Sequence, residues 1–549
     1  MTLRLEDHGF LRGETPFLRD LPAEDCLHVA FVRSTVAHGE LRGVERASAL
    51  DAPGVVAVLA AADLGMRPFR PFDAVPEHFA RHPLATGRVR FVGEPVAVVV
   101  AETAAQAVDA AEEVAVLVDA LPAVVDADAA LAPGAPALFA DAPGNVVIHY
   151  DRGRVADLFE TAALVVEGRF PNQRLASAPM EPSAIVARPS GEGLDVWATC
   201  QGVHVARHEL APPLGMDEAD IRVRAAAVGG GFGGRHSIPV EFVVVAAAAR
   251  HLGRALRWDE TRTENLLTMV HGRAQCHELA MGFDDDGRIV GLRVRNLADC
   301  GAYPHFGPLM PFMSRKLACG PYRVPRVDYE WLAYATNTNP IGPYRGAGQP
   351  EVTNGLERAL DLAAAQLGLD PLELRRRNLL GPGELPHTTV TGLTYDSGDY
   401  PAALARAARL VDYEDVRADQ AARRARRDQV QLGVGVACYV SATDGRTEFG
   451  AVDVAPEDGT VTVRCGTLSH GQSHATTVGA VVAAQLGVGL EAIHYVDADT
   501  DLVPRGEGTG GSRSAQMAGS AALQAAHQVL EQARALAAAR LEADPADWW

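Results

Sequence analysis

The sequence predicts an α+β protein of several domains, and three observations carry this prediction. With 549 residues, 48% of them hydrophobic and 22% charged, the chain has an ordinary globular composition and is too long for one core. Short apolar runs typical of strands alternate with longer amphipathic runs typical of helices. A stretch without a sustained apolar period, residues 130–144, and a strongly charged stretch, residues 401–429, indicate connections between domains.

The first unit, residues 1–140, is expected to be a small α+β domain. It ends at the stretch 130–144, whose proline and glycine residues break helices. Its expected elements are strands at Leu27–Arg33, Val55–Ala60 and Val96–Ala101 and a helix at Ala104–Val114.

The second unit, residues 145–410, is expected to be a larger α/β body, and the charged stretch that follows is expected to be a solvated helix and linker. A third body is expected over residues 430–549, and Trp548 and Trp549 give it an unusual apolar end. The expected elements are strands at Ile221–Val228 and Ile289–Asn296 and helices at Val240–Leu252, Glu351–Leu367 and Ala515–Leu541.

Several classes of protein are disfavoured by the composition. The formal net charge of −20 and the pI near 5.3 would repel nucleic acid. No uncharged run is long enough to span a bilayer, and the start Met1–His8 has no apolar core flanked by basic residues, so a cytoplasmic protein is expected. The seven cysteines are scattered without metal-ligand spacing, so any redox centre would have to be an organic cofactor, a metal held by one, or a partner's cluster.

The strongest local feature is the glycine-rich stretch Gly229–Arg235, which lies between an expected strand and an expected helix. Glycine permits positive φ and lets backbone N–H groups approach an anion. The stretch also fits GxGxxG through Gly229, Gly231 and Gly234, and Asp259 in the next expected strand could bind a ribose. A nicotinamide- or flavin-dependent dehydrogenase is therefore an alternative.

Three further loops of the same character occur far away in the sequence: Gly342–Glu351, Gly471–His474 and Gly508–Ser514. One dinucleotide site on a single βαβ unit would not require them. A long anionic ligand that needs donors from several segments would require such loops. The four loops together therefore favour a long anionic ligand over a dinucleotide.

These four loops, in this order, resemble those of the large subunits of molybdenum hydroxylases of the xanthine dehydrogenase/aldehyde oxidase family. The stretches Val32–His38, Val92–Ala97, Met180–Pro182, His271–Arg273 and Asp299–Tyr303 extend the resemblance over nearly the whole chain. It implies an N-terminal a/b hammerhead domain followed by two molybdopterin-binding α/β domains, the last one incomplete. It also implies a molybdopterin cofactor, expected as the cytosine dinucleotide, whose dithiolene sulfurs hold the molybdenum.

The resemblance implies roles for individual residues. Gln201 matches a glutamine that hydrogen-bonds an oxo ligand of the metal, and Phe232 matches a phenylalanine that lines the substrate channel. These two are the expected catalytic residues. The expected cofactor-binding residues are Gly230, Gly231, Phe232, Gly233, Arg345, Gly346, Ala347, Gly471, Gln472, His474, Gly510, Ser512, Arg513 and Ser514.

Two positions bear on the substrate. Gly346 occupies the place where carbon monoxide dehydrogenases of the family carry a copper-binding cysteine, which disfavours carbon monoxide. His236 occupies the place where xanthine-oxidising members carry a glutamate, which puts purines in doubt. An N-heteroaromatic compound or an aldehyde remains the expected substrate.

In the family a glutamate in a late segment acts as the base, water supplies the oxygen, and electrons leave through iron–sulfur clusters to FAD. That segment is not found before Trp549, and neither Glu181 nor Glu351 is expected to replace its glutamate. The expected partners are an iron–sulfur subunit, an FAD subunit and a second chain that completes the molybdenum subunit. A truncated gene and a non-catalytic molybdopterin-binding or scaffold relative are the alternatives.

Overall fold

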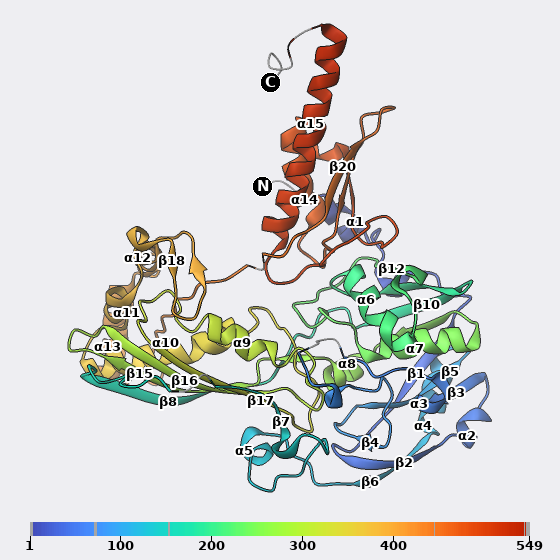
Figure 1. Cartoon of the computed structure of the whole chain (residues 1–549), viewed down its shortest axis with the longest axis horizontal. Coiled ribbons are helices and arrows are strands. Elements are labelled where there is room, and N and C mark those ends of the chain that lie inside the picture. Colours follow the sequence, from blue (N-terminus) through green and yellow to red (C-terminus); the bar gives the residue numbers. More distant parts are fainter. Residues whose placement is uncertain (1–3, 71–73, 152–153, 444, 543, 545–549) are drawn as a thin grey trace.

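The computed structural model describes residues 4–70, 74–151, 154–443, 445–542 and 544, and its fold is α+β as the sequence predicts. Three bodies are visible in Figure 1: one around a seven-stranded sheet at the lower right, one around a five-stranded sheet at the lower left, and a C-terminal body above them. No helix within the described residues combines the length and the apolar character that a membrane span needs.

The seven-stranded sheet joins the N-terminal unit to the body that follows it. Its order is β12-β11-β10-β13-β1-β5-β3, and β1 pairs in parallel with β13 through Leu27 and Leu256. One sheet thus continues across the connection predicted at residues 130–144. Its strands are β1 (Leu27–Arg33), β3 (Val55–Ala60), β5 (Pro95–Ala101), β10 (Ala184–Ser190), β11 (Gly193–Ala198), β12 (Ile221–Arg224) and β13 (Leu256–Asp259).

Three helices pack on this sheet: α4 (Ala104–Glu112), α6 (Val203–Leu214) and α7 (Val240–Leu252). Every residue of α7 from its first turn to Ala249 is buried, as expected of a helix that is apolar on nearly all sides. Because α6 begins directly after Gly202, the packing of this helix fixes the segment that contains Gln201. The N-terminal unit also holds a small sheet of β2 (Gly39–Glu45), β4 (Arg88–Val89) and β6 (Ala115–Ala120).

The five-stranded sheet has the order β7-β17-β16-β15-β8, and helices α9 (Leu309–Lys316), α10 (Gln349–Leu367) and α11 (Pro371–Asn378) belong to the same body. Helix α10 packs on β8 and β15, and its apolar side joins the largest hydrophobic core. The strands are β7 (Val146–Tyr150), β8 (Leu164–Asn172), β15 (Gln275–Phe283), β16 (Ile289–Asp299) and β17 (Val327–Tyr334).

The charged stretch forms two helices, and the C-terminal body follows it. Its final helix, predicted from Ala515, begins with a π-helical turn at Ser514–Ala518 before α15. Trp548 and Trp549 lie outside the described residues. The elements are α12 (Tyr400–Leu410), α13 (Tyr413–Arg426), β20 (Gly450–Val454), β21 (Val461–Cys465), α14 (His474–Leu486), β22 (Ile493–Val496) and α15 (Gly519–Leu541).

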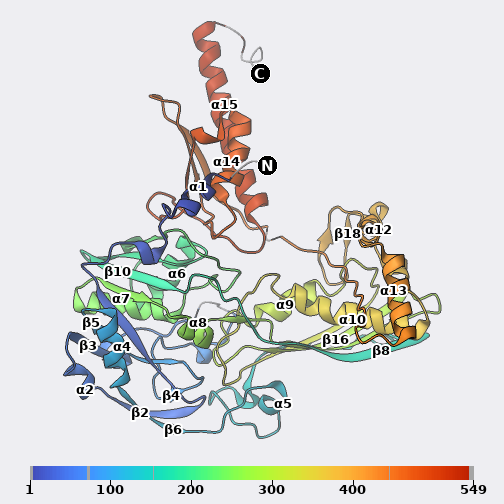
Figure 2. The same cartoon turned by 180° about the vertical axis from the view of Figure 1, so that it is seen from behind.

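The N-terminal helix α1 (Leu5–Arg12) lies against α14, far from the rest of its own unit, as Figures 1 and 2 both show. Thr476 of α14 donates its backbone N–H to Glu6 across 3.2 Å and its hydroxyl to the same carboxylate across 2.6 Å. Arg4 donates to the Ser473 hydroxyl across 3.2 Å. The first residues of the described chain thus contact the Gly471–His474 loop and the start of α14.

One predicted strand is shorter than expected. The sequence indicates a strand over residues 221–228, but β12 ends at Arg224. The next residues hydrogen-bond elsewhere: Ala225 N donates to Ala498 O across 3.0 Å, and Ala227 N donates to Pro16 O across 3.1 Å. The apolar run therefore continues in extended pairing with distant segments, which periodicity alone does not reveal.

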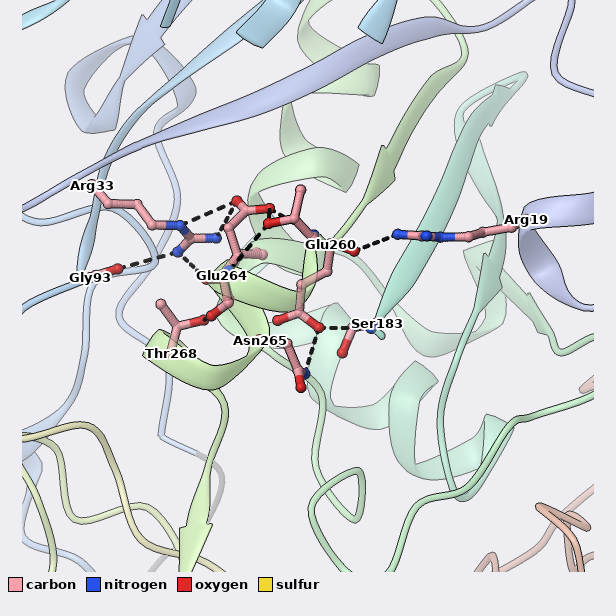
Figure 3. Close-up of polar contacts among 10 residues, drawn as sticks. Arg19, Arg33, Gly93, Ser183, Glu260, Glu264, Asn265 and Thr268 are labelled. Carbon is pink, nitrogen blue, oxygen red and sulfur yellow. Dashed lines mark hydrogen bonds and ion pairs between the residues drawn. The ribbon is translucent and has the colours of Figure 1, made fainter. Parts of the chain in front are cut away.

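The N-terminal unit is fixed to the adjoining body by buried charges, which Figure 3 shows. Arg33 of β1 donates to Glu241 across 2.7 Å, to Glu264 across 3.0 Å and to the carbonyl of Gly93 across 3.2 Å. In the same view Glu260 accepts hydrogen bonds from Ser183 N and from the Asn265 amide.

Candidate functional site

Several positions of the glycine-rich loop Gly229–Arg235 require glycine. Gly230 and Gly233 have φ of 102° and 99°. A Cβ at Gly233 would lie 2.7 Å from the Pro343 carbonyl oxygen, and a Cβ at Gly231 would lie 2.6 Å from Oε1 of Gln201. The glycines are therefore needed for close approach to two other segments.

Gln201 ties three segments together with both ends of its amide. Its Oε1 accepts hydrogen bonds from the N–H groups of Gly233 and Arg235, across 2.8 and 3.3 Å. Its Nε2 donates to the Thr509 carbonyl across 2.8 Å, and Thr509 N donates back to the Gln201 carbonyl across 2.8 Å. Because an amide nitrogen carries two hydrogens, one donor of this buried side chain stays available for a ligand.

The loop around Arg345 lies against the glycine-rich loop. Arg345 N donates to the Phe232 carbonyl across 2.9 Å, and the Arg345 guanidinium lies 4.9 Å from the centroid of the Phe232 ring. Gly346 and Ala347 both have positive φ, and Arg345 and Gly346 are exposed. A cation and an aromatic ring therefore face solvent side by side at this edge of the site.

Arg273 supports the same loop from below. Its guanidinium donates to the carbonyls of Tyr344 and Arg345, across 3.1 and 2.7 Å, and pairs with Glu351 across 3.4 Å. Burial raises the pKa of Glu351. In the sequence Arg273 stands out only as part of the motif His271–Arg273, since nothing in its neighbourhood indicates which distant carbonyls it holds.

The loop Gly471–His474 leads into α14; it ends on one histidine, His474, and a second, His470, directly precedes it. His474, the first residue of α14, is buried, and neither of its ring nitrogens has a hydrogen-bond partner among the described residues. Burial lowers the pKa of His474 to about 4, so its ring is neutral. The Gln472 side chain accepts a hydrogen bond from His470 N across 2.8 Å and stays exposed. The buried ring of His474 thus has unused hydrogen-bonding capacity beside an open loop.

In the loop Gly508–Ser514, Arg513 is occupied differently from the expectation. Its guanidinium is fully buried, pairs with the buried carboxylate of Glu448 across 2.7 Å and also donates to the carbonyls of Arg446 and Thr447. Ser512 is exposed, and the Ser514 hydroxyl lies 3.3 Å from that of Thr509. Arg513 therefore shapes the loop from inside, whereas Ser512 faces outward.

The structure brings the four loops to one region. Gly510 approaches the glycine-rich loop so closely that a Cβ there would lie 3.1 Å from Nδ1 of His236. His470, next to Gly471, hydrogen-bonds to the backbone of Thr509. Burial and, to a smaller extent, the charge of Arg235 lower the pKa of His470. Gln201 joins Thr509 of the loop Gly508–Ser514 to the glycine-rich loop, and Arg345 joins the glycine-rich loop to the loop Gly342–Glu351. Each of the four loops therefore contacts at least one other. This is the arrangement that a single extended ligand requires.

The same geometry argues against a dinucleotide turn at Gly229–Gly234. Helix α7 begins only at Val240, so the loop does not open it directly. Strand β13, which ends at Asp259, runs antiparallel to β10, and Asp259 pairs with Arg257 across 2.6 Å. A ribose-binding acid in a parallel βαβ unit is therefore not formed here.

Two carboxylates near the loops have structural tasks. Glu181 accepts the Gly229 N–H across 2.7 Å and pairs with Arg235, which also donates to the Glu181 carbonyl. Glu351 is fully buried at the start of α10 and pairs with Arg273. These contacts agree with the interpretation that neither residue is the base.

Sequence analysis missed a third carboxylate, Glu209 in α6. It is buried, and burial raises its pKa to about 7. Nothing in the local pattern distinguishes it from a surface glutamate of an amphipathic helix. Its partners, Ser237 and Ile238, are far away in the sequence.

The raised pKa of Glu209 makes a prediction about stability. Between the unfolded pKa near 4.5 and the folded value near 7, only the folded state keeps the proton, so the free energy of unfolding falls as pH rises through this window. Glu209→Gln, which cannot ionise, should remove up to about 3 kcal/mol of that fall. Chemical denaturation at pH 5 and pH 8 measures it. The same change at exposed Glu192 is the control, and an equal pH dependence in both variants would refute the prediction.

Comparisons with known proteins agree with this geometry. The family described as "Molybdopterin cofactor-binding domain" matches residues 138–379 and, in a second model, residues 406–548. The a/b hammerhead domain of aldehyde oxidase and xanthine dehydrogenase matches residues 12–122.

Two curated relatives and one solved structure illustrate the similarity. The gamma subunit of the 6-hydroxypseudooxynicotine dehydrogenase complex of Paenarthrobacter nicotinovorans is 35% identical over 99% of this chain and 70% of its own length. The carbon monoxide dehydrogenase large chain of Hydrogenophaga pseudoflava is 32% identical over 99% of this chain and 72% of its own.

The crystal structure of quinoline 2-oxidoreductase from Pseudomonas putida 86 superposes with a TM-score of 0.93 at 35% identity, covering 100% of this chain and 72% of that one. Both the sequence similarity and the superposition extend over essentially all of the present chain. The chain therefore belongs to the xanthine dehydrogenase family, as a molybdopterin-binding large subunit of a molybdenum hydroxylase.

Proposed function

We propose that this chain forms the molybdenum site of an enzyme that oxidises an N-heteroaromatic compound or an aldehyde and takes the oxygen from water. The contacts that join the four small-residue loops, two of them through the buried amide of Gln201, carry the proposal. Relatives named for nicotine hydroxylation and quinoline oxidation support a heteroaromatic substrate. Gly346 stands against carbon monoxide because glycine offers no thiolate for copper.

The residues present fit a molybdopterin, proposed here as the cytosine dinucleotide. Backbone N–H groups and small residues of the loops leave room for a long anion, and His474 offers two buried ring nitrogens without partners among the described residues. When bound, the cofactor supplies the two-electron oxidation. We propose that Gly471, Gln472, Ser512 and Ser514 contact its anionic part.

The remaining cofactor-binding assignments follow from the same loops. We propose that Gly230, Gly231, Gly233, Ala347 and Gly510 approach the cofactor with their backbone. Arg513 contributes through the shape of its loop, because its own guanidinium is occupied by Glu448.

Each side chain at the centre has a distinct proposed task. The remaining amide hydrogen of Gln201 orients the reacting end of the cofactor. Phe232 offers a ring on which a planar substrate can stack, and Arg345 beside that ring binds a polar substituent. Because Glu181 and Glu351 are engaged with arginines, we propose that the base is contributed by residues other than those described, on a partner chain.

Iron–sulfur and FAD subunits are proposed as electron acceptors, since relatives are named as subunits of complexes. Affinity purification of the full chain with its co-purifying proteins tests the proposal. We expect about one molybdenum per chain, a pterin nucleotide in the extract, and transfer of oxygen from labelled water into quinoline or benzaldehyde.

Two results would contradict this function. A tightly bound flavin on this chain without molybdenum would favour a flavin-dependent dehydrogenase. A bound pterin without oxidation of any heteroaromatic compound or aldehyde, in a complex that retains all its chains, would favour a non-catalytic relative.

A further inference from the structure

Helix α6 holds the segment of the glycine-rich loop at two places. At its N-terminal end Gln201 accepts the N–H groups of Gly233 and Arg235. One and a half turns into the helix, Glu209 Oε2 accepts the Ser237 hydroxyl across 2.6 Å and the Ile238 N–H across 2.7 Å. All of these partners of Glu209 are buried. The residues just before and just after His236 are thus fixed to one rigid element.

A histidine, His305, makes a further contact with Ser237. It follows β16 and belongs to the other large body. Its Nε2 lies 3.0 Å from the Ser237 hydroxyl oxygen. When Ser237 gives its one hydroxyl hydrogen to Glu209, its oxygen is left as an acceptor, and His305 then donates from Nε2. Burial lowers the pKa of His305 to about 3, so its ring is neutral. Hydrogen bonds therefore run in one direction from His305 through Ser237 to Glu209.

The hydrogen bonds of Arg235 and Ser237 fix the position of His236, which lies between them in the chain. The His236 ring packs edge-on against Phe306 with centroids 5.4 Å apart, and its Nδ1 approaches Gly510 of the C-terminal body. On the opposite side, Ser237 and His305 line a cavity of about 60 Å³ between the N-terminal unit and the body that follows. A cavity of this volume has room for about two waters, and Nδ1 of His305 has no hydrogen-bond partner among the described residues.

We propose that Glu209, Ser237 and His305 form a positioning network that sets the glycine-rich loop and His236 against the Gly510 loop. Glu209 anchors this network, because it accepts the hydrogen bonds from both Ser237 and Ile238. The assignment of these residues to substrate oxidation rests on the function proposed above. Their effect on the order of the loop does not.

The experiment uses the purified complex with Glu209→Ala, Glu209→Gln and Ser237→Ala, and with Glu192→Ala and Ser190→Ala as exposed controls. Hydrogen exchange of residues 229–238 is measured first, because it needs no turnover. We expect exchange to rise about tenfold in Glu209→Ala and Ser237→Ala, which leave buried groups without partners. Glu209→Gln should stay within about twofold, since its amide oxygen accepts the same two donors.

The second measurement is kcat/KM per bound molybdenum, together with the electron paramagnetic resonance signal of the partly reduced metal. We expect about a tenfold lower kcat/KM and an altered signal in Glu209→Ala, with rescue by Glu209→Gln. Unchanged exchange, or a loss of activity that only follows loss of molybdenum, overturns the network. If the wild-type complex contains no molybdenum and exchange is still faster in Glu209→Ala and Ser237→Ala, the proposed function is overturned and the network stands.

Discussion

Replacing Gln201 by leucine should lower kcat, counted per bound molybdenum, by about 100-fold or more. The change leaves the N–H groups of Gly233 and Arg235 without their acceptor and the Thr509 carbonyl without a donor, all in a buried region. It also removes the remaining amide hydrogen that the site can offer a ligand. Loss of one preorganised donor at a reaction centre costs about 10²–10³ in rate. Steady-state kinetics with an artificial electron acceptor, together with metal analysis, measures the effect.

Gln201→Glu separates the two tasks of this residue. The carboxylate keeps acceptors for Gly233 and Arg235 but cannot donate, so the loop should stay ordered while turnover remains low. Gln173→Leu, at an exposed position before β10, is the control and should behave as wild type. Near-normal kcat in Gln201→Leu would remove this residue from the centre of the site.

The parts of the site that sequence predicts are those where one residue type is required locally. Gly230, Gly231 and Gly233 can be recognised because positive φ or close approach excludes other side chains, whatever the rest of the fold does. The helix predicted at Val240–Leu252 is found with the same bounds, because its apolar run is long and ends before Gly253.

Pairings between distant segments escape such reasoning. Leu27 and Leu256 share a sheet only because of how the first two units pack, and Glu209 meets Ser237 only because of how α6 packs within its own unit. For the same reason a sequence does not reveal whether a charge near a loop is available. Arg513 was expected to bind the cofactor, yet its charge is already matched by Glu448 at a distance of 65 residues along the chain.

This buried pair gives the second large effect. Glu448→Leu should destabilise the C-terminal body by about 3–5 kcal/mol, because it leaves the Arg513 guanidinium buried without a counter-charge. Denaturant unfolding of the purified complex, followed by hydrogen exchange in α15, measures the loss. The molybdenum content per chain should fall as well, since the contacts of Arg513 hold the loop Gly508–Ser514 in place.

The double variant Glu448→Leu with Arg513→Met decides whether the charge or the packing matters. If the unpaired charge is the cause, the double variant should recover a large part of the stability lost in Glu448→Leu, because two apolar side chains can replace a buried ion pair. Arg534→Met, which breaks the exposed pair with Glu531 on α15, should cost less than about 1 kcal/mol. Equal losses in the single and double variants would instead mean that the carbonyl contacts of Arg513, and not its charge, hold the loop.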